Sequence, residues 1–277
     1  EVTAKHKIPH VFGFGATEVV NETFQSDPEY YGYWAFKGWP SPSKLSISYV
    51  QALEDAIATG KWTPADKTVA IYGEDTDWGR SFGGAIKGQL EDAGWTVVAE
   101  EYFALDQTEF YPLLNKFKDL NPALIAGTST ALPVVSNFVK QVDEVGLESL
   151  VIMDGLGWFG EWYDSIGNAS NYVLDQIPGW ATAEGQAFAA DFEAAAGFPP
   201  SPSAGGLSYD GVNFFIAVAN ATLAEYGDLT SETIYQFIQE KLWTGEWSYT
   251  DGIVMSNYAA AAETIPDPVV GQGYYIF

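Results

Sequence analysis

The residues best placed for chemistry lie in the segment 69–79, Val-Ala-Ile-Tyr-Gly-Glu-Asp-Thr-Asp-Trp-Gly. An apolar run ends at Gly73, a polar turn follows, and the turn ends at Trp78, directly before a helical pattern. Open α/β sheets bind their ligands at the loops that follow the carboxyl ends of the strands. An indole at this point is either a packing residue that anchors the next helix or a lid over a small molecule.

Other patterns argue against catalysis and metal binding. The chain has no cysteine, which excludes disulfides, thiolate metal sites and cysteine nucleophiles. Its two histidines, His6 and His10, have the spacing of metal ligands on a helix, but Pro9 lies between them where a strand begins. The acidic turn 74–77 lacks calcium-loop spacing and is interpreted as a solvated turn with a helix cap. Phosphate-binding glycine loops and Gly-x-Ser-x-Gly elbows are also missing from the sequence. We therefore expect that the protein binds no cofactor and is not an enzyme.

The composition is that of an acidic globular protein. Of 277 residues, 47% are hydrophobic and 16% aromatic, including 10 Trp, which is enough apolar material for one large or two medium cores. The 12 basic and 37 acidic residues give a net charge of −25, which repels phosphate backbones and argues against a nucleic-acid partner. This charge suits a salty or extracellular medium, and no apolar run reaches transmembrane length.

The middle of the chain alternates between strand and helix patterns. A helix runs from Leu45 to Gly60 and precedes this alternation. Strands alternating with helices of this length indicate a parallel sheet with both faces covered. The expected strands are 67–72, 95–103, 123–127 and 149–153, and the expected helices are 79–93, 107–120 and 132–145.

The two ends of the chain follow a different pattern. A short strand is expected at 8–14, followed by an irregular aromatic region at 21–42. The helices expected after Gln176 have no strands between them, so they must pack on the sheet that begins near Ile8. These helices are 184–195, 207–226 and 231–242, separated in part by a loop at 198–206. The chain would leave one lobe, build a second and return, and such crossings form a hinge beside a cleft.

An ordered series of motifs is shared with a known family. The motifs are the segment 69–79, the helix 80–94, the strand 95–103, Asp106-Gln107-Thr108-Glu109-Phe110, Asn121-Pro122-Ala123-Leu124-Ile125 and Val145-Gly146-Leu147. The series resembles the second lobe of type I periplasmic binding proteins, and most of all the branched-chain amino acid (leucine/isoleucine/valine) receptors of ABC importers. The resemblance covers essentially the whole chain.

The resemblance implies a two-lobed α/β fold with parallel sheets flanked by helices. Residues 1–41 and 180–246 would form an incomplete first lobe, and residues 42–179 and 247–277 the second. Both ends of the chain look cut in comparison with the family. Residues 1–7 read as the end of a helix, and residues 273–277 as a strand in progress.

The resemblance also implies which residues line the cleft. They are Gly15, Ala16, Thr17, Trp39, Trp78, Ser129, Thr130, Asp154, Trp158 and Tyr209. Asp154 would pair with the ammonium group of a ligand, and Trp78 would close over it. The family often has an aromatic residue where this chain has 128–130, Thr-Ser-Thr, which weakens the case for a leucine-like ligand. Each ring could instead be a core residue.

The function implied is capture of an amino acid or a similar small polar molecule by lobe closure. The protein would be the solute-binding component of an ABC importer, periplasmic or extracellular, lipid-anchored or soluble, with a membrane permease as its partner. A ligand-sensing domain with the same fold is the first alternative, because fold alone does not fix function. A hydrolase is the second alternative and has no recognisable nucleophile to support it.

Overall fold

The computed structural model describes residues 2–12, 16–37, 41–158, 162–176, 180, 182–249 and 251–253. These residues divide into two compact units. The first unit contains the described residues of 2–41 and 180–253, and the second contains those of 42–176.

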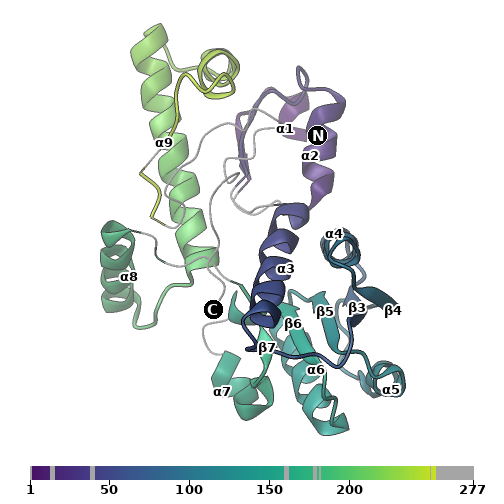
Figure 1. Cartoon of the computed structure of the whole chain (residues 1–277). Coiled ribbons are helices and arrows are strands. Elements are labelled where there is room, and N and C mark those ends of the chain that lie inside the picture. The colour runs from purple at the N-terminus through teal and green to yellow at the C-terminus, as the bar shows by residue number, and fades with distance from the viewer. Residues whose placement is uncertain are drawn as a thin grey trace. The chain divides into compact units, whose positions relative to one another are not determined.

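The second unit is built on a five-stranded sheet in which all neighbouring strands are parallel (Figure 1). Its strand order is β4-β3-β5-β6-β7. The strands are β3 (Thr68–Glu74), β4 (Thr96–Phe103), β5 (Leu124–Thr128), β6 (Leu150–Asp154) and β7 (Val173–Leu174). The predicted α/β fold class with a parallel sheet is therefore confirmed.

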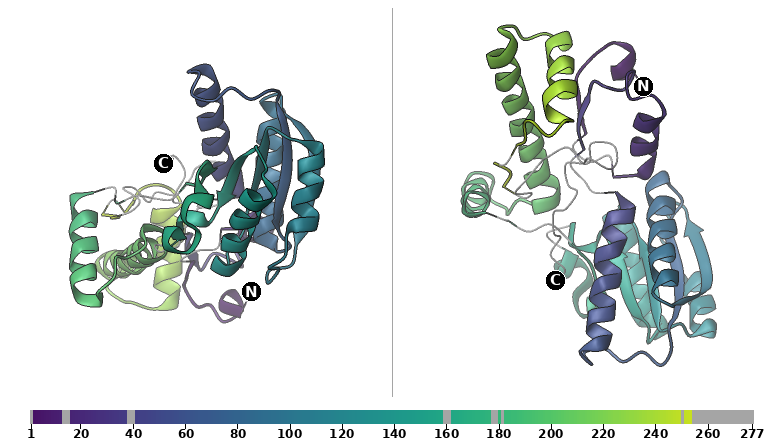
Figure 2. Two further views of the ribbon diagram at one scale, coloured as in Figure 1. Left: turned by 90° about the horizontal axis from the view of Figure 1, so that it is seen from below. Right: turned by 45° about the horizontal axis from the view of Figure 1, so that its top comes forward.

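Helices cover both faces of this sheet (Figure 2). Two helices pack on each other on one face, and two more cover the opposite face with a short helix nearby. On the first face lie α3 (Pro42–Ala58) and α4 (Asp77–Asp92), and on the second lie α5 (Tyr111–Leu120), α6 (Leu132–Val145) and α7 (Trp162–Ile166). Single 3₁₀ turns occur at Leu156–Trp158 and Gly167–Ser170.

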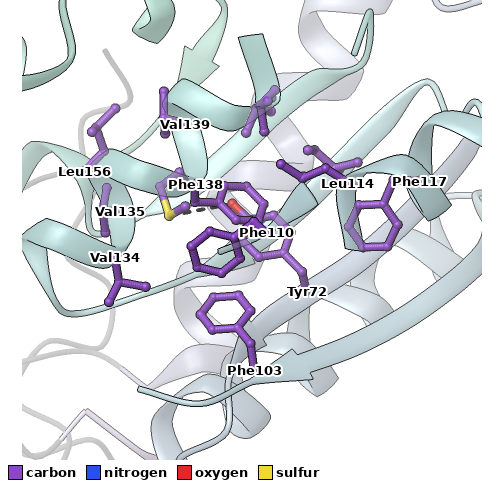
Figure 3. Close-up of a cluster of buried hydrophobic side chains, with 14 of the residues drawn as sticks. Tyr72, Phe103, Phe110, Leu114, Phe117, Val134, Val135, Phe138, Val139 and Leu156 are labelled. Carbon is purple, nitrogen blue, oxygen red and sulfur yellow. Dashed lines mark hydrogen bonds between the residues drawn. The ribbon is translucent and has the colours of Figure 1, made fainter. Parts of the chain in front are cut away.

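The alternation of side chains along β3 supplies the core on both faces. Ala70 and Tyr72 point to the face covered by α5 and α6, as successive strand residues alternate between faces. Figure 3 shows Tyr72 among aromatic rings of this core. Its ring lies 4.3 Å from that of Phe138, while Phe110 and Phe103 meet edge to face at 5.0 Å. These rings join the strand, the loop after β4 and α6 into one hydrophobic cluster.

Local sequence signals set the helix ends in this unit. The Thr76 hydroxyl accepts from the backbone N–H of Gly79 over 3.1 Å, which confirms the helix cap predicted in the turn 74–77. At the other end of a helix, Gly146 follows α6 with a φ of +65°, a conformation that glycine adopts without strain.

The first unit combines a two-stranded parallel sheet with helices. The strands are β1 (His10–Phe12) and β2 (Trp34–Lys37), and α9 packs against β1. The helices are α1 (Val2–Lys5), α2 (Glu18–Ser26), α8 (Ala183–Ala196), α9 (Leu207–Tyr226) and α10 (Ser231–Phe237), with π-helical turns at Pro202–Gly206 and Ile238–Leu242.

Several sequence predictions differ from these elements. The region 21–42 is not irregular throughout, because α2 continues to Ser26 and β2 spans Trp34–Lys37. The predicted loop at 198–206 contains a π-helical turn, and the predicted helix at 107–120 begins only at Tyr111. Strand β7 was not predicted, since its two residues are too short to show a period.

The end of the described chain belongs with the first unit. Residues 247–277 were predicted to belong to the second lobe. In the structure, the rings of Trp247 and Tyr249 lie 6.2 and 5.8 Å from the ring of Phe214 in α9. The backbone N–H of Ile253 donates to Asp210 of the same helix over 2.8 Å. The strand expected at 273–277 lies outside the described residues.

Candidate functional site

The candidate site lies at the carboxyl edge of the second unit's sheet. Strands β3, β5 and β6 are neighbours, and Thr128 pairs in register with Gly73 on one side and Asp154 on the other. The loops after the three strands therefore start side by side. All five site residues predicted from the sequence for the second lobe lie at or after these strand ends: Trp78, Ser129, Thr130, Asp154 and Trp158.

Trp78 contacts both its own helix and the neighbouring loops. It is half-buried at the start of α4, with its ring 5.7 Å from that of Phe82 and 6.2 Å from that of Trp158. Its indole N–H donates to the Thr128 hydroxyl over 3.0 Å. Trp78 thus anchors the helix and also presents part of its ring beside a second indole.

Thr128 links the strand ends from within. Its side chain is fully buried, and its hydroxyl donates to the backbone carbonyl of Asp154 over 2.8 Å. The same oxygen accepts from the Trp78 indole, so both hydrogen-bonding functions are used internally. Thr128 therefore acts in positioning Trp78 and is not free to contact a ligand.

A buried carboxylate orders the loop after β5. Glu74 is 2% exposed, and its oxygens accept from the backbone N–H and the hydroxyl of Thr130 over 2.7 and 2.8 Å, and from Thr76 over 2.9 Å. The prediction of a solvated acidic turn is correct for Asp75 and Asp77, which are exposed, and wrong for Glu74. Consecutive residues of β3 are buried, which means that both faces of the strand are covered. Glu74 continues this strand and is therefore buried as well.

Asp154 belongs to a buried network that the sequence did not reveal. Its side chain is 0% exposed, and the Tyr49 hydroxyl of α3 lies 2.8 Å from its Oδ1. The same hydroxyl lies 2.8 Å from Oδ1 of Asp175, which follows β7. The Asp175 carboxylate also accepts backbone N–H groups from Gly157 over 2.5 Å and from Gln176 over 2.7 Å.

Burial changes the titration of both carboxyl groups. Burial, and then the charge of Asp175, raise the pKa of Asp154 well above its ordinary value. Burial raises the pKa of Asp175 to about 6, against the opposing effect of the hydrogen bonds that it accepts. Burial and the two aspartates likewise raise the pKa of the Tyr49 hydroxyl, which stays protonated.

The loop after β6 needs glycine at its first position. Gly155 has a φ of +113°, and a Cβ on it would lie 2.4 Å from the carbonyl oxygen of Ser129. This close approach brings the loop of Trp158 against the loop of Ser129. Ser129 itself is fully buried, whereas Thr130 is exposed and Trp158 half-buried.

The remaining predicted residues belong to the first unit or lie outside the described residues. Ala16 and Thr17 precede α2, where the Thr17 hydroxyl accepts from the backbone N–H of Val19 over 3.3 Å as a helix cap. Tyr209 of α9 is 43% exposed, and its ring lies 4.4 Å from that of Phe188. Gly15 and Trp39 lie outside the described residues.

Comparisons with known proteins identify the family. A sequence profile described as periplasmic binding protein matches residues 1–252. The chain belongs to the periplasmic binding protein family. The resemblance stated from the sequence is confirmed, and membership in this family implies a solute-binding protein with an extracytoplasmic location.

Solved structures of such proteins share the fold. A putative branched-chain amino acid ABC transporter protein from Silicibacter pomeroyi is 18% identical, with a TM-score of 0.78 over 99% of this chain and 70% of that one. A solute binding protein from Rhodopseudomonas palustris BisB5, in complex with 3,4-dihydroxybenzoic acid, is 20% identical, with a TM-score of 0.74 over 99% and 69%. A branched-chain amino acid substrate binding protein from Streptococcus pneumoniae, in complex with isoleucine, is 14% identical, with a TM-score of 0.73 over 99% and 70%.

The described residues of this periplasmic binding protein contain neither a candidate metal centre nor a candidate membrane-spanning helix. Within that part of the chain, no group of three or more His, Cys, Asp or Glu side chains is placed to hold a metal ion. No helix formed by these residues combines the length and the apolar character needed to cross a bilayer.

Proposed function

We propose that this protein is the extracytoplasmic solute-binding component of an ABC importer, capturing a small polar ligand by closure of its two units. The observation that carries the proposal is the pair of half-buried indoles at the carboxyl edge of the second unit, Trp78 and Trp158, with rings 6.2 Å apart. Edges of this kind are where open α/β sheets bind ligands, and indoles offer an apolar surface with one N–H donor.

The polar part of the proposed site is a set of hydroxyls and backbone groups. Thr130 is exposed in the loop after β5, and two hydrogen bonds to Glu74 fix its orientation. In the first unit, Ala16, Thr17 and Tyr209 are proposed to complete the contacts when the units close, together with Gly15 and Trp39. A membrane permease that recognises the closed form is the proposed partner.

The ligand class follows from what the second unit exposes. Asp154 and Glu74 are both buried, so the predicted residues after β5 and β6 expose hydroxyl and indole groups and no charge. Such a surface suits an apolar or aromatic ligand body with polar ends. Isoleucine and 3,4-dihydroxybenzoic acid, which occupy two of the similar structures, represent the two chemical options, an amino acid and an aromatic acid.

Calorimetry and thermal shift with both classes of ligand test the proposal. Isoleucine, benzoate and 3,4-dihydroxybenzoate are each titrated into the folded protein, and at least one is expected to bind and to raise the unfolding temperature. A ligand present at 100 times its Kd should stabilise the folded state by about 2.7 kcal/mol. Absence of binding by every member of a wider amino-acid and aromatic-acid panel would contradict the proposal.

A pair of Trp variants locates the site. Trp78→Ala removes the indole at the proposed site and is expected to weaken binding at least tenfold, about 1.4 kcal/mol. Trp62→Ala is the matched control, because Trp62 precedes the amino end of β3 and stacks on Trp95 at 5.7 Å. Equal affinities of the two variants would remove Trp78 from the site.

A further inference from the structure

Three polar groups meet at one hydroxyl oxygen inside the second unit. Tyr49 Oη lies 2.8 Å from an oxygen of Asp154 and 2.8 Å from an oxygen of Asp175. The backbone N–H of Gln176 donates to the same hydroxyl over 3.0 Å. A phenol hydroxyl has one proton to donate and accepts through its lone pairs.

The two short distances from the Tyr49 hydroxyl are incompatible with two ionised carboxylates. The single Tyr49 proton can serve one carboxylate, and the other would then face an oxygen lone pair at 2.8 Å without a hydrogen between the two atoms. The two negative charges would also share a site away from water, which is costly. One extra proton on the pair removes both problems, because a protonated carboxyl donates to Tyr49 Oη.

The surroundings decide which aspartate carries that proton. Asp175 accepts backbone N–H groups from Gly157, Gln176 and, over 3.3 Å, Gly155, and such bonds favour an ionised carboxylate. Among the described residues, fewer groups donate to the Asp154 carboxyl. Apart from Tyr49 its carboxyl has a contact of 3.4 Å with the Thr128 hydroxyl, whose shorter bond goes to the Asp154 backbone carbonyl.

We propose that Asp154 is a protonated hydrogen-bond donor at neutral pH and a positioning residue for the two indoles of the site. Asp154 donates to Tyr49, and Tyr49 donates to the Asp175 carboxylate, which binds the backbone N–H of Gly157 beside Trp158. On the other side, the Asp154 carbonyl accepts from Thr128, which accepts from Trp78. The Asp154 proton therefore acts through Tyr49 and Asp175 on the loop of Trp158, while the Asp154 backbone positions Trp78 through Thr128, and Asp154 is not the counter-ion of a ligand ammonium.

In the part of the chain that the structure describes, no basic group compensates a second charge on the pair. Tyr49 of α3 is hydrogen-bonded to both aspartates, and the two aspartates together raise the pKa of Tyr72 of β3 after the larger effect of its burial. Among the described residues, no Lys, Arg or His forms an ion pair or a hydrogen bond with either aspartate. Loss of the proton at high pH therefore leaves two facing charges and is expected to separate Asp154 from Tyr49.

Carboxyl ¹³C NMR of the full chain tests the protonation state directly. One aspartate carboxyl carbon is expected to keep the chemical shift of a protonated acid at pH 7, and this signal should be missing in Asp154→Asn. The proposal is overturned if every aspartate carboxyl is ionised at pH 7. It is also overturned if the signal persists in Asp154→Asn and disappears in Asp175→Asn.

Thermal unfolding against pH provides a second, independent readout. The folded state holds the proton more tightly than the unfolded chain, whose aspartates titrate near the ordinary value of 3.8, so this part of the stability falls as pH rises above that value. Asp154→Asn keeps a donor to Tyr49 and should flatten the profile, whereas the exposed control Asp164→Asn should retain the wild-type slope. Identical profiles for wild type and Asp154→Asn would overturn the proposal.

Neither measurement uses a ligand, so their failure is distinct from failure of the proposed function. The consequence for binding does rest on that function. If a ligand is found, Asp175→Asn, which loses the acceptor for the Gly157 loop, should bind it at least tenfold more weakly at pH 7 than the exposed control Asp164→Asn. A tenfold loss in Asp154→Asn for a cationic ligand alone would restore the counter-ion role and overturn the proposal.

Discussion

Buried carboxyl groups at strand ends organise the loops of the candidate site. Glu74 ends β3 and accepts hydrogen bonds from the loop after β5, while Asp154 ends β6 and joins α3 to the chain after β7. Both carboxyl groups form hydrogen bonds with other groups of the protein. Residue type at a strand end thus identifies the candidate ligand-binding edge, whereas burial separates the side chains that are available to a ligand from those that support the loops.

Replacing Glu74 by Gln tests this support at the scale of one residue. The amide oxygen can keep the two bonds from Thr130, which share one carboxylate oxygen, but the amide presents N–H groups where the other oxygen accepted from the Thr76 hydroxyl. A buried donor facing another donor costs about 1–3 kcal/mol, so urea unfolding should show a loss of that size. The exposed control Glu109→Gln should change the stability by about 0.5 kcal/mol or less. Similar small changes in both variants would show that Glu74 does not order the loop.

At the scale of elements, the loops after β5 and β6 meet at a single glycine. Gly155→Ala would force a Cβ to within 2.4 Å of the Ser129 carbonyl oxygen at a φ of +113°. We expect a loss of about 1–3 kcal/mol in the free energy of unfolding and a change in the fluorescence of the neighbouring indoles. Gly84→Ala is the matched control, since a Cβ there meets nothing within 4 Å in the interior of α4. This control should gain up to about 1 kcal/mol from helix propensity, and a loss in both variants would contradict the argument.

The elements that the sequence predicts well are those with a clear period. Strands β3 to β6 and helices α3, α4 and α6 lie close to their predicted positions, because alternation and helical spacing are local properties. The Asp154–Tyr49–Asp175 network could not be predicted in this way. Its hydrogen bonds join residues 105 and 126 positions apart, and only the packing of α3 on the sheet brings them together. Asp175 also follows a strand of two residues, which leaves no pattern to mark it.

At the scale of the whole molecule, the dominant electrostatic feature is the net charge of −25. Ion pairs such as Lys67–Glu54 and Lys87–Glu100 use some of the 12 basic residues, so most of the 37 acidic groups repel one another. This repulsion is stronger in the compact folded state than in the expanded unfolded chain. Salt reduces the distance over which charges interact from about 30 Å at 0.01 M to about 8 Å at 0.15 M.

We therefore expect the midpoint of thermal unfolding to rise as NaCl is increased from 0.01 M to 0.15 M and beyond. The few surface ion pairs are weakened by the same screening, but each contributes only about 0–1 kcal/mol, which is less than the relief of repulsion among so many acidic groups. KCl at equal ionic strength should give the same shift if screening is the cause, whereas a shift seen with one cation alone would indicate specific ion binding. A midpoint that falls with both salts would mean that favourable ion pairs outweigh the repulsion of the excess carboxylates.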